Sequence, residues 1–297
     1  MSKYIPGLTA PATTDMPVLL AAPASRHTPR ALNFSHWLAG IPLWLPFLLL
    51  SVALLWPAIL LAQDTGETRI TPLEALWRWM PFLLQRGFLF TVIISVLTMA
   101  FGTVLGVFLG LGQISLFRPV RIASYWITQI FRNSPWLVLL FIVMLSFPFQ
   151  ITVFGFRIPV PDWSKAVIGL SLPVMANISE IVRGAIASVP SAQWEASESL
   201  AFSRRQTLFQ IILPQCIKRM IPPWMNWYAI LTMATPIVSI LGVEEVLNLT
   251  RQAIEAENNR PELLVPFYGF LLLIFFLYCY PIARVTVWLE SKFALKL

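Results

Sequence analysis

The chain has 297 residues, of which 57% are hydrophobic and only 12% are charged, and its net charge is +7. Soluble domains carry about 25% charged residues, so this composition argues against a soluble globular protein and indicates a membrane protein. The basic residues are scattered over segments that flank apolar runs and form no patch, which argues against a nucleic-acid partner.

The first 40 residues are rich in Pro, Ala and Thr and poor in aromatic side chains. This composition predicts a mobile tail, which we place in the cytoplasm. The apolar run that follows begins too late and is too long for a cleaved signal peptide.

Uncharged apolar runs recur along the rest of the chain. A bilayer core about 30 Å thick requires about 20 apolar residues in a helix, and these runs lack the alternation of barrel strands. We therefore predict an all-α membrane protein with six transmembrane helices, at residues 41–62, 88–112, 134–154, 164–187, 222–243 and 263–285. Residues 63–86 are predicted to form a periplasmic loop.

The distribution of charge sets the predicted orientation. An even number of spans puts both termini on one side of the membrane. With a cytoplasmic N-terminus, the inner segments hold most of the 21 Lys and Arg residues, and the outer segments hold most of the 14 Asp and Glu residues. The sequence thus predicts a multi-pass protein of the inner membrane, in contact with lipid, with both termini in the cytoplasm.

A polar segment, residues 190–216, interrupts the apolar sequence on the predicted cytoplasmic side. Its first part, "SAQWEASESLA", contains no Gly or Pro and favours a short helix. Ser203 and Gln206 have the spacing of a capping box that opens a second helix, which Pro214 is expected to end or kink. We expect an ordered helix, turn and helix at the membrane surface, either seated in the interface or connected to a partner.

Charged residues also occur within the predicted fourth span. Glu180 and Arg183 are three positions apart, on one helical face and near the cytoplasmic end. They form either an interfacial ion pair or, together with Asn177, part of the gate of a translocation path.

Hydroxyl groups form a stripe along the predicted fifth span. Tyr228, Thr232, Thr235 and Ser239 are spaced four, three and four residues apart. The stripe either hydrogen-bonds a neighbouring helix or lines a path for a polar solute. In the second span, Gly102, Gly106 and Gly110 form a smooth face that favours close approach of another helix.

Several kinds of chemistry have no sequence signature here. The chain has no Gly-rich loop ending in Lys-Ser or Lys-Thr, and both histidines precede the first predicted span. The two cysteines suggest neither a disulfide framework nor a metal site. We therefore expect no catalytic residues, no cofactor and no metal, and an energy source outside this chain.

The polar segment resembles a known motif. Glu195, Ala196 and Ser197, then Ala201 and later Ile211, Leu213 and Pro214, have the spacing of E-A-A, three residues, G, nine residues, I-x-L-P. This motif marks membrane subunits of binding-protein-dependent ABC importers. Two further stretches, "FRNSPWLVLLF" (131–141) and "ISEIVRGAIASVPSAQWEA" (178–196), resemble the polar amino acid permeases of that family. Ala replaces Gly at position 201, and Ala disfavours a positive φ.

The resemblance implies a MetI-like permease domain at 87–297, with five core spans and 41–62 as an extra N-terminal span. It also implies a transport subunit, not an enzyme, that imports a polar amino acid or similar solute. The implied partners are ABC ATPase subunits docked on a cytoplasmic coupling helix, an external solute-binding protein and a second permease subunit, identical or related. The alternatives are an ion-coupled secondary transporter or channel, and a membrane sensor or scaffold.

Overall fold

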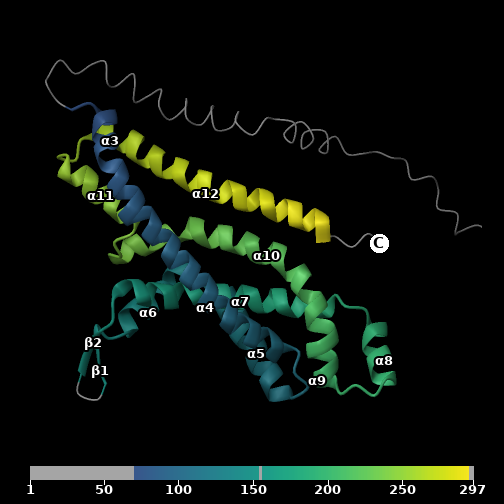
Figure 1. Cartoon of the computed structure of the whole chain (residues 1–297). Coiled ribbons are helices and arrows are strands. Elements are labelled where there is room, and N and C mark those ends of the chain that lie inside the picture. The colour runs from purple at the N-terminus through teal and green to yellow at the C-terminus, as the bar shows by residue number, and fades with distance from the viewer. Residues whose placement is uncertain (1–69, 154–155, 294–297) are drawn as a thin grey trace, which may run out of the picture. The chain divides into compact units, whose positions relative to one another are not determined.

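The computed structural model describes residues 70–153 and 156–293, all within the compact unit Leu50–Leu297. The predicted tail, 1–40, and the predicted first span, 41–62, lie outside the described residues. Figure 1 shows a bundle of long helices with short helices at both ends.

The first described helix begins earlier than the sequence predicted. Helix α3 (Pro72–Phe82) continues through a π-helical turn, η2 (Leu83–Phe88), into α4 (Leu89–Gln113). Thr71 and Glu74 form a capping box, and Pro72 in the first turn suits a helix start. Residues 72–86, predicted as loop, are therefore helical, and the segment Pro72–Gln113 is one candidate membrane span.

The predicted third span, 134–154, is not one straight helix. Helix α5 (Arg118–Arg132) and helix α6 (Trp136–Ser146) form a pair bent by 104°. Ser134 and Phe147 each precede a proline, which disfavours helical backbone at those residues and ends each helix there.

A small hairpin follows α6, so the fold is not entirely helical. Strands β1 (Gln150–Val153) and β2 (Phe156–Pro159) pair antiparallel, with Gln150 opposite Pro159.

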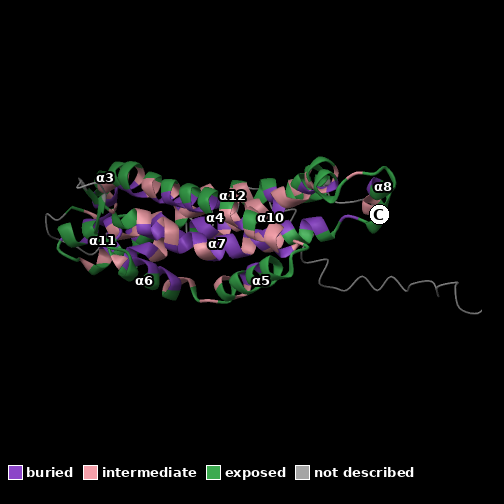
Figure 2. Ribbon diagram, turned by 90° about the horizontal axis from the view of Figure 1, so that it is seen from below, coloured by how far each residue is buried: buried purple, intermediate pink, exposed green. Residues whose placement is uncertain are grey.

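Helix α7 (Asp162–Ala187) is the innermost span. In its most apolar window 72% of the residues are buried, against 33% for Pro72–Gln113, and Figure 2 shows it among the other helices. It packs against α4, α5, α6 and α10. The predicted glycine face fits closely here: a Cβ on Gly106 would lie 2.7 Å from Ile178 Cβ, and one on Gly110 would lie 2.8 Å from Val182 Cβ. Close approach of two helices is therefore the function of this face.

The polar segment forms α8 (Ser191–Ser199) and α9 (Arg204–Gln206), as the helix predictions require. After α9 the chain continues through a π turn, η3 (Thr207–Ile212), into α10 (Leu213–Ala234) and a 3-10 turn, η4 (Thr235–Leu241). Pro214 does not end the helix, because the wider turn before it, in which Leu213 N–H bonds the Leu208 carbonyl, places it in the first turn of α10.

The last elements are α11 (Val246–Ala256), a 3-10 turn η5 (Pro261–Leu263) and α12 (Leu264–Phe293). The described residues contain four helical segments long and apolar enough to cross a membrane, or up to five if the bent α5–α6 pair is one span. In both views α8 lies at one end of the bundle and α11 at the other (Figures 1 and 2).

Candidate functional site

The turn between α8 and α9 has a well-defined geometry. Ala201 has φ +59°, the left-handed conformation that favours glycine. Its N–H bonds the Glu198 carbonyl at 2.9 Å, and the Phe202 N–H bonds the Ser197 carbonyl at 3.1 Å. These two bonds make a Schellman motif, which satisfies the last carbonyls of α8. Ala201 therefore adopts the positive φ that alanine disfavours, and the paired hydrogen bonds hold the turn in that conformation.

The second helix begins as the sequence predicted. Ser203 accepts a hydrogen bond from the Gln206 N–H, and the Gln206 side chain accepts one from the Ser203 N–H at 2.9 Å. The two helices are also held by the Arg204 guanidinium, which lies 5.4 Å from the Trp194 ring centroid. The segment is therefore ordered on both sides of its turn.

Residues 190–216, which the resemblance predicts to contact ATPase subunits and which we call the coupling segment, are anchored to the end of α7. Arg219, one turn beyond it in α10, donates to the Ser188 carbonyl at 3.0 Å and to its hydroxyl at 2.7 Å. The Cys216 thiol lies 3.4 Å from the Ala185 carbonyl. These contacts join the segment to the innermost span.

The motif residues differ in exposure along the coupling segment. Ser197 is 3% exposed, and its hydroxyl donates to the Gln193 carbonyl. Ile211 and Leu213 are half-buried and pack against the main apolar core. The others are exposed: Glu195, Ala196, Ala201 and Pro214. The apolar side chain of Leu200, at the turn, is 72% exposed. Arg204 and Arg205 are exposed as well, so the segment presents acidic, basic and apolar side chains to its surroundings.

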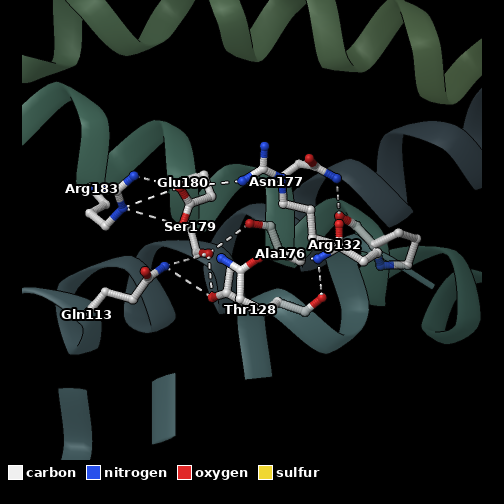
Figure 3. Close-up of polar contacts among 11 residues, drawn as sticks. Gln113, Thr128, Arg132, Ala176, Asn177, Ser179, Glu180 and Arg183 are labelled. Atoms are coloured by element: carbon white, nitrogen blue, oxygen red, sulfur yellow. Dashed lines mark hydrogen bonds and ion pairs between the residues drawn. The ribbon is translucent and has the colours of Figure 1, made fainter. Parts of the chain in front are cut away.

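A second polar cluster joins α4, α5 and α7 (Figure 3). The Gln113 amide donates to Thr128 Oγ1 at 3.1 Å and to Ser179 Oγ at 3.2 Å, and all three side chains are buried. Because the Ser179 hydroxyl donates to the Ala176 carbonyl, Thr128 donates to Ser179 across 2.9 Å. This network was missed from the sequence, because α5 was not predicted as a helix.

Glu180 and Arg183 pair as the sequence predicted, with Arg183 Nη2 2.7 Å from Glu180 Oε2. Arg132 Nη1 approaches the same carboxylate oxygen at 3.6 Å, so one acid faces two guanidinium groups. Asn177 is turned to its own helix and donates to the Pro173 carbonyl at 2.8 Å.

A hollow of about 450 Å³ lies beside this cluster. Its lining combines charged, amide and aromatic side chains: Gln113, Arg121, Ile122, Tyr125, Trp126, Gln129, Glu180 and Arg183. Within this lining, Arg183 is paired with Glu180, the single acidic side chain.

The hydroxyl stripe of α10 and η4 is engaged within the protein. Tyr228 Oη lies 2.7 Å from Tyr278 Oη of α12, Thr232 donates to the Tyr228 carbonyl, and Thr235 donates to the Leu231 carbonyl. Ser239 is buried, and its hydroxyl has no hydrogen-bond partner within the described ranges. This geometry favours helix packing over a lining of an open path.

A buried carboxylate was also missed from the sequence. Glu245 caps the N-terminus of α11 and is fully buried. Burial raises the pKa of its carboxyl to about 7, although hydrogen bonds from Leu247, Asn248 and Thr91 act in the opposite direction. The sequence could have indicated Glu245 as an acidic N-cap before a helix, but it gave no sign that this carboxylate would be buried.

Comparison with known proteins identifies the chain's relatives. The family model described as "Binding-protein-dependent transport system inner membrane component" matches residues 102–294. The chain is 32% identical over 211 residues to the L-cystine transport system permease protein TcyB of Bacillus subtilis, covering 71% of this chain and 86% of the relative. It is 34% identical over 187 residues to the arginine transport system permease protein ArtQ of the same organism, covering 63% and 82%.

Two solved structures share the fold. An amino acid ABC transporter with histidines superposes with a TM-score of 0.62 at 22% identity, covering 73% of this chain and 96% of that chain. The MetNI methionine ABC transporter in an inward facing conformation superposes with a TM-score of 0.55 at 19% identity, covering 71% and 97%. Because the family model matches most of the chain and the described residues contain several helices apolar enough to span a membrane, the chain is a multi-pass membrane permease. It belongs to the MetI-like inner membrane components of binding-protein-dependent transport systems.

Proposed function

We propose that this chain is the permease subunit of an ATP-driven importer of a polar amino acid or a similar small solute. The relatives named above include cystine and arginine permeases, which supports this substrate class. ATP hydrolysis belongs to partner subunits, and the chain itself is a transport subunit and not an enzyme.

The observation that carries the proposal is the order of the coupling segment. Its two helices are fixed by a Schellman turn and a capping box, and Arg219 of α10, into which the chain continues after α9, bonds Ser188 at the end of α7. A flexible loop would dissipate a displacement of a docked partner, whereas this arrangement passes it to the innermost span. Exposed Glu195 and Leu200 supply a charge and an apolar anchor for that partner.

The proposed contact residues are those of the motif. ATPase subunits dock on the coupling segment through Glu195 and Ala196, with Ala201 and Pro214 exposed beside them. Ser197 is buried and Ile211 and Leu213 are half-buried, the latter two against the main apolar core, so these three residues support the segment from within the protein. The chain pairs with a second permease subunit, and an external binding protein delivers the solute.

The proposed orientation follows from the same segment. If ATPase subunits dock on α8 and α9, this end of the bundle faces the cytoplasm. The C-terminal end of α12 lies at that end as well, and α11 lies at the opposite end (Figure 1). The charge bias of the sequence agrees with a cytoplasmic C-terminus.

We place the solute gate beside Glu180 and Arg183. Their ion pair borders the 450 Å³ hollow, and the side chain of Arg183 is 45% exposed whereas that of Glu180 is 17% exposed. Glu180→Gln removes the charge that holds Arg183 and Arg132, so we expect a higher KM for uptake with little change in the ATPase activity without solute. Equal KM values in the variant and the parent chain would remove this pair from the path.

Purification and reconstitution test the proposed function. The chain is co-expressed with candidate ATPase and binding-protein partners and inserted into liposomes, and uptake of radiolabelled amino acids is measured. We expect uptake to require ATP, the ATPase and the binding protein together. Uptake by the chain alone, driven by a sodium or proton gradient, would instead support the alternative of a secondary transporter.

A further inference from the structure

The end of the bundle opposite the coupling segment contains a fully buried carboxylate. Glu245 Oε1 accepts from the N–H groups of Leu247 at 2.9 Å and Asn248 at 3.1 Å, which caps α11. Its other oxygen lies 3.2 Å from the hydroxyl of Thr91 in α4. The same hydroxyl accepts from the Val246 N–H at 3.2 Å. The first turn of α11 is therefore bound to α4 by two polar contacts.

The backbone around this contact is tightly packed. A Cβ on Gly87 in η2 would lie 2.9 Å from Val246 Cα, so glycine at this position permits the approach. The Val246 side chain is also buried against Leu271 and Ile274 of α12. The N-terminal end of α11 is thus seated against two long helices.

The other end of α11 is held by a second carboxylate. Glu257 forms an ion pair with Arg78, and the Trp79 indole N–H donates to it at 2.9 Å. Both partners belong to α3, which continues into α4. An apolar cluster fills the space between the two carboxylates: Ala75, Leu76, Leu83, Leu249, Ala253, Ile254, Leu263 and Phe267. Helix α11 is therefore attached at both ends to the single long helix Pro72–Gln113.

The connection from α10 to α11 differs from these attachments, because it contains a glycine with a positive φ. It passes through Gly242, whose φ is +82°. Among residues 70–153 and 156–293, no atom other than those of its chain neighbours lies within 4 Å of a Cβ built at this position. Glycine is the residue best able to change backbone conformation there. The possible joint is confined to this one residue, because the next residue, Val243, is 3% exposed and is buried in the same core cluster as Leu231 and Val238.

We propose that Glu245 is a positioning residue that keeps α11 docked on η2 and α4 while the segment Arg204–Leu241 moves during transport, with Gly242 as the hinge. The inference rests on the proposed function, because it is coupling to the ATPase that moves this segment. Helix α11 then acts as part of the stationary wall at the outer end of the path.

Paired variants test the docking contact in the complete transporter. Thr91→Val removes the hydroxyl that bonds Glu245 and Val246 but keeps the side-chain volume, and Thr91→Ser keeps the hydroxyl. Glu245→Ala and Glu245→Gln form a second pair, with the exposed neighbour Glu244→Gln as a control. A role confined to folding would lower the yield of complex but not the amount of solute taken up per ATP hydrolysed. We expect Thr91→Val and Glu245→Ala to lower that ratio about tenfold, and their partners to stay within about twofold.

Distance measurements test the hinge directly. Nitroxide labels on Gln252→Cys in α11 and Trp77→Cys in α3 report one distance, and labels on Gln252→Cys and Lys218→Cys in α10 report the other. All three positions are exposed, and the native Cys216 and Cys279 are buried. Between the ATP-free and vanadate-trapped complexes, we expect the first distance to stay constant and the second to change.

The outcomes separate this inference from the proposed function. A constant distance from Gln252 to Lys218, or a distance from Gln252 to Trp77 that changes as much, overturns the hinge. An unchanged uptake ratio in Thr91→Val and Glu245→Ala removes the positioning role. If uptake needs no ATPase at all, the proposed function fails, whatever the labels report.

Discussion

The two ends of the helix bundle are held together in different ways. At the coupling end, α8 and α9 are shaped by bonds between residues a few positions apart, such as Phe202 to Ser197 and Ser203 to Gln206. At the opposite end, α11 is attached by Glu245 and Glu257, whose partners are distant in the sequence. Thr91 is 154 residues from Glu245, and Trp79 is 178 residues from Glu257.

This difference separates a contact surface from a fixed structural support. Local bonds leave outward side chains of the coupling segment exposed, among them Glu195 and Leu200, and these are the side chains that we propose to contact a partner. Buried carboxylates with distant partners instead hold one helix against another, because leaving either partner unpaired costs free energy. The comparison predicts that substitutions around α11 lower the stability of the protein as well as the uptake per ATP, whereas substitutions on α8 lower uptake with little loss of stability.

The largest stability effect is expected from Glu245 and depends on pH. The folded-state pKa of about 7 lies above the usual 4.5, so the folded state binds the proton more tightly than the unfolded state. The stability that the protonated Glu245 carboxyl contributes to the folded state is fully present below pH 4.5 and is lost as pH rises through 7. Thermal unfolding in nanodiscs measures the difference between the parent chain and Glu245→Gln. That difference should change by about 3 kcal/mol over this range.

Arg251 is the charged side chain that acts on Glu245 and lowers its pKa. An Arg251→Gln variant should therefore move the transition to higher pH. A stability difference between Glu245→Gln and the parent chain that is independent of pH would show that the buried carboxyl does not titrate in this range.

A smaller loss is expected from Glu257→Ala. The variant leaves Arg78 and the Trp79 indole without their acceptor, although Arg78 is 56% exposed and regains water. We expect the free energy of unfolding to fall by about 2 kcal/mol, measured by thermal or denaturant unfolding in detergent. Glu255→Ala, an exposed position on the same helix, is the matched control and should change stability little. Equal losses in the two variants would mean that α3 and α11 are held by apolar contact alone.

The smallest effect is expected at the coupling turn, and it is a gain. Ala201→Gly relieves the cost of a positive φ and should stabilise the protein by about 1 kcal/mol. Ala196→Gly, within α8, should cost about 1 kcal/mol because it only adds backbone freedom. Limited proteolysis at the turn, compared between the two variants, measures this difference. Faster cleavage of Ala201→Gly than of the parent chain would argue against the left-handed turn.

The same contrast explains what could be predicted from the sequence. The capping box of Ser203 and Gln206, the short helix α8 and the pair of Glu180 and Arg183 depend on spacings of three or four residues, which a sequence displays directly. The partners of Glu245 and of Gln113 lie on other helices, and no local pattern indicates which helices will meet.

The errors in the predicted elements have local physical causes. Residues 72–86 were predicted as loop because charged and aromatic side chains interrupt their apolar pattern. In the structure, α11 and α12 cover the apolar face of this segment. The span 134–154 was predicted from apolar length alone, which ignores that Ser134 and Phe147 precede prolines. Pro214 was expected to end or kink a helix, but the π turn η3 before it places it in the first turn of α10. The predicted first span, 41–62, and the tail lie outside the described residues.

Charge reversal on α8 tests the coupling function most directly. Glu195→Lys and Glu198→Lys reverse the charge of two exposed residues on the same short helix, and only Glu195 belongs to the motif. ATP-driven amino acid uptake is measured in proteoliposomes that contain the permease, the ATPase and the binding protein. We expect Glu195→Lys to reduce uptake by more than about tenfold, and Glu198→Lys to leave it within about twofold. Normal uptake by Glu195→Lys would show that α8 does not couple this permease to an ATPase.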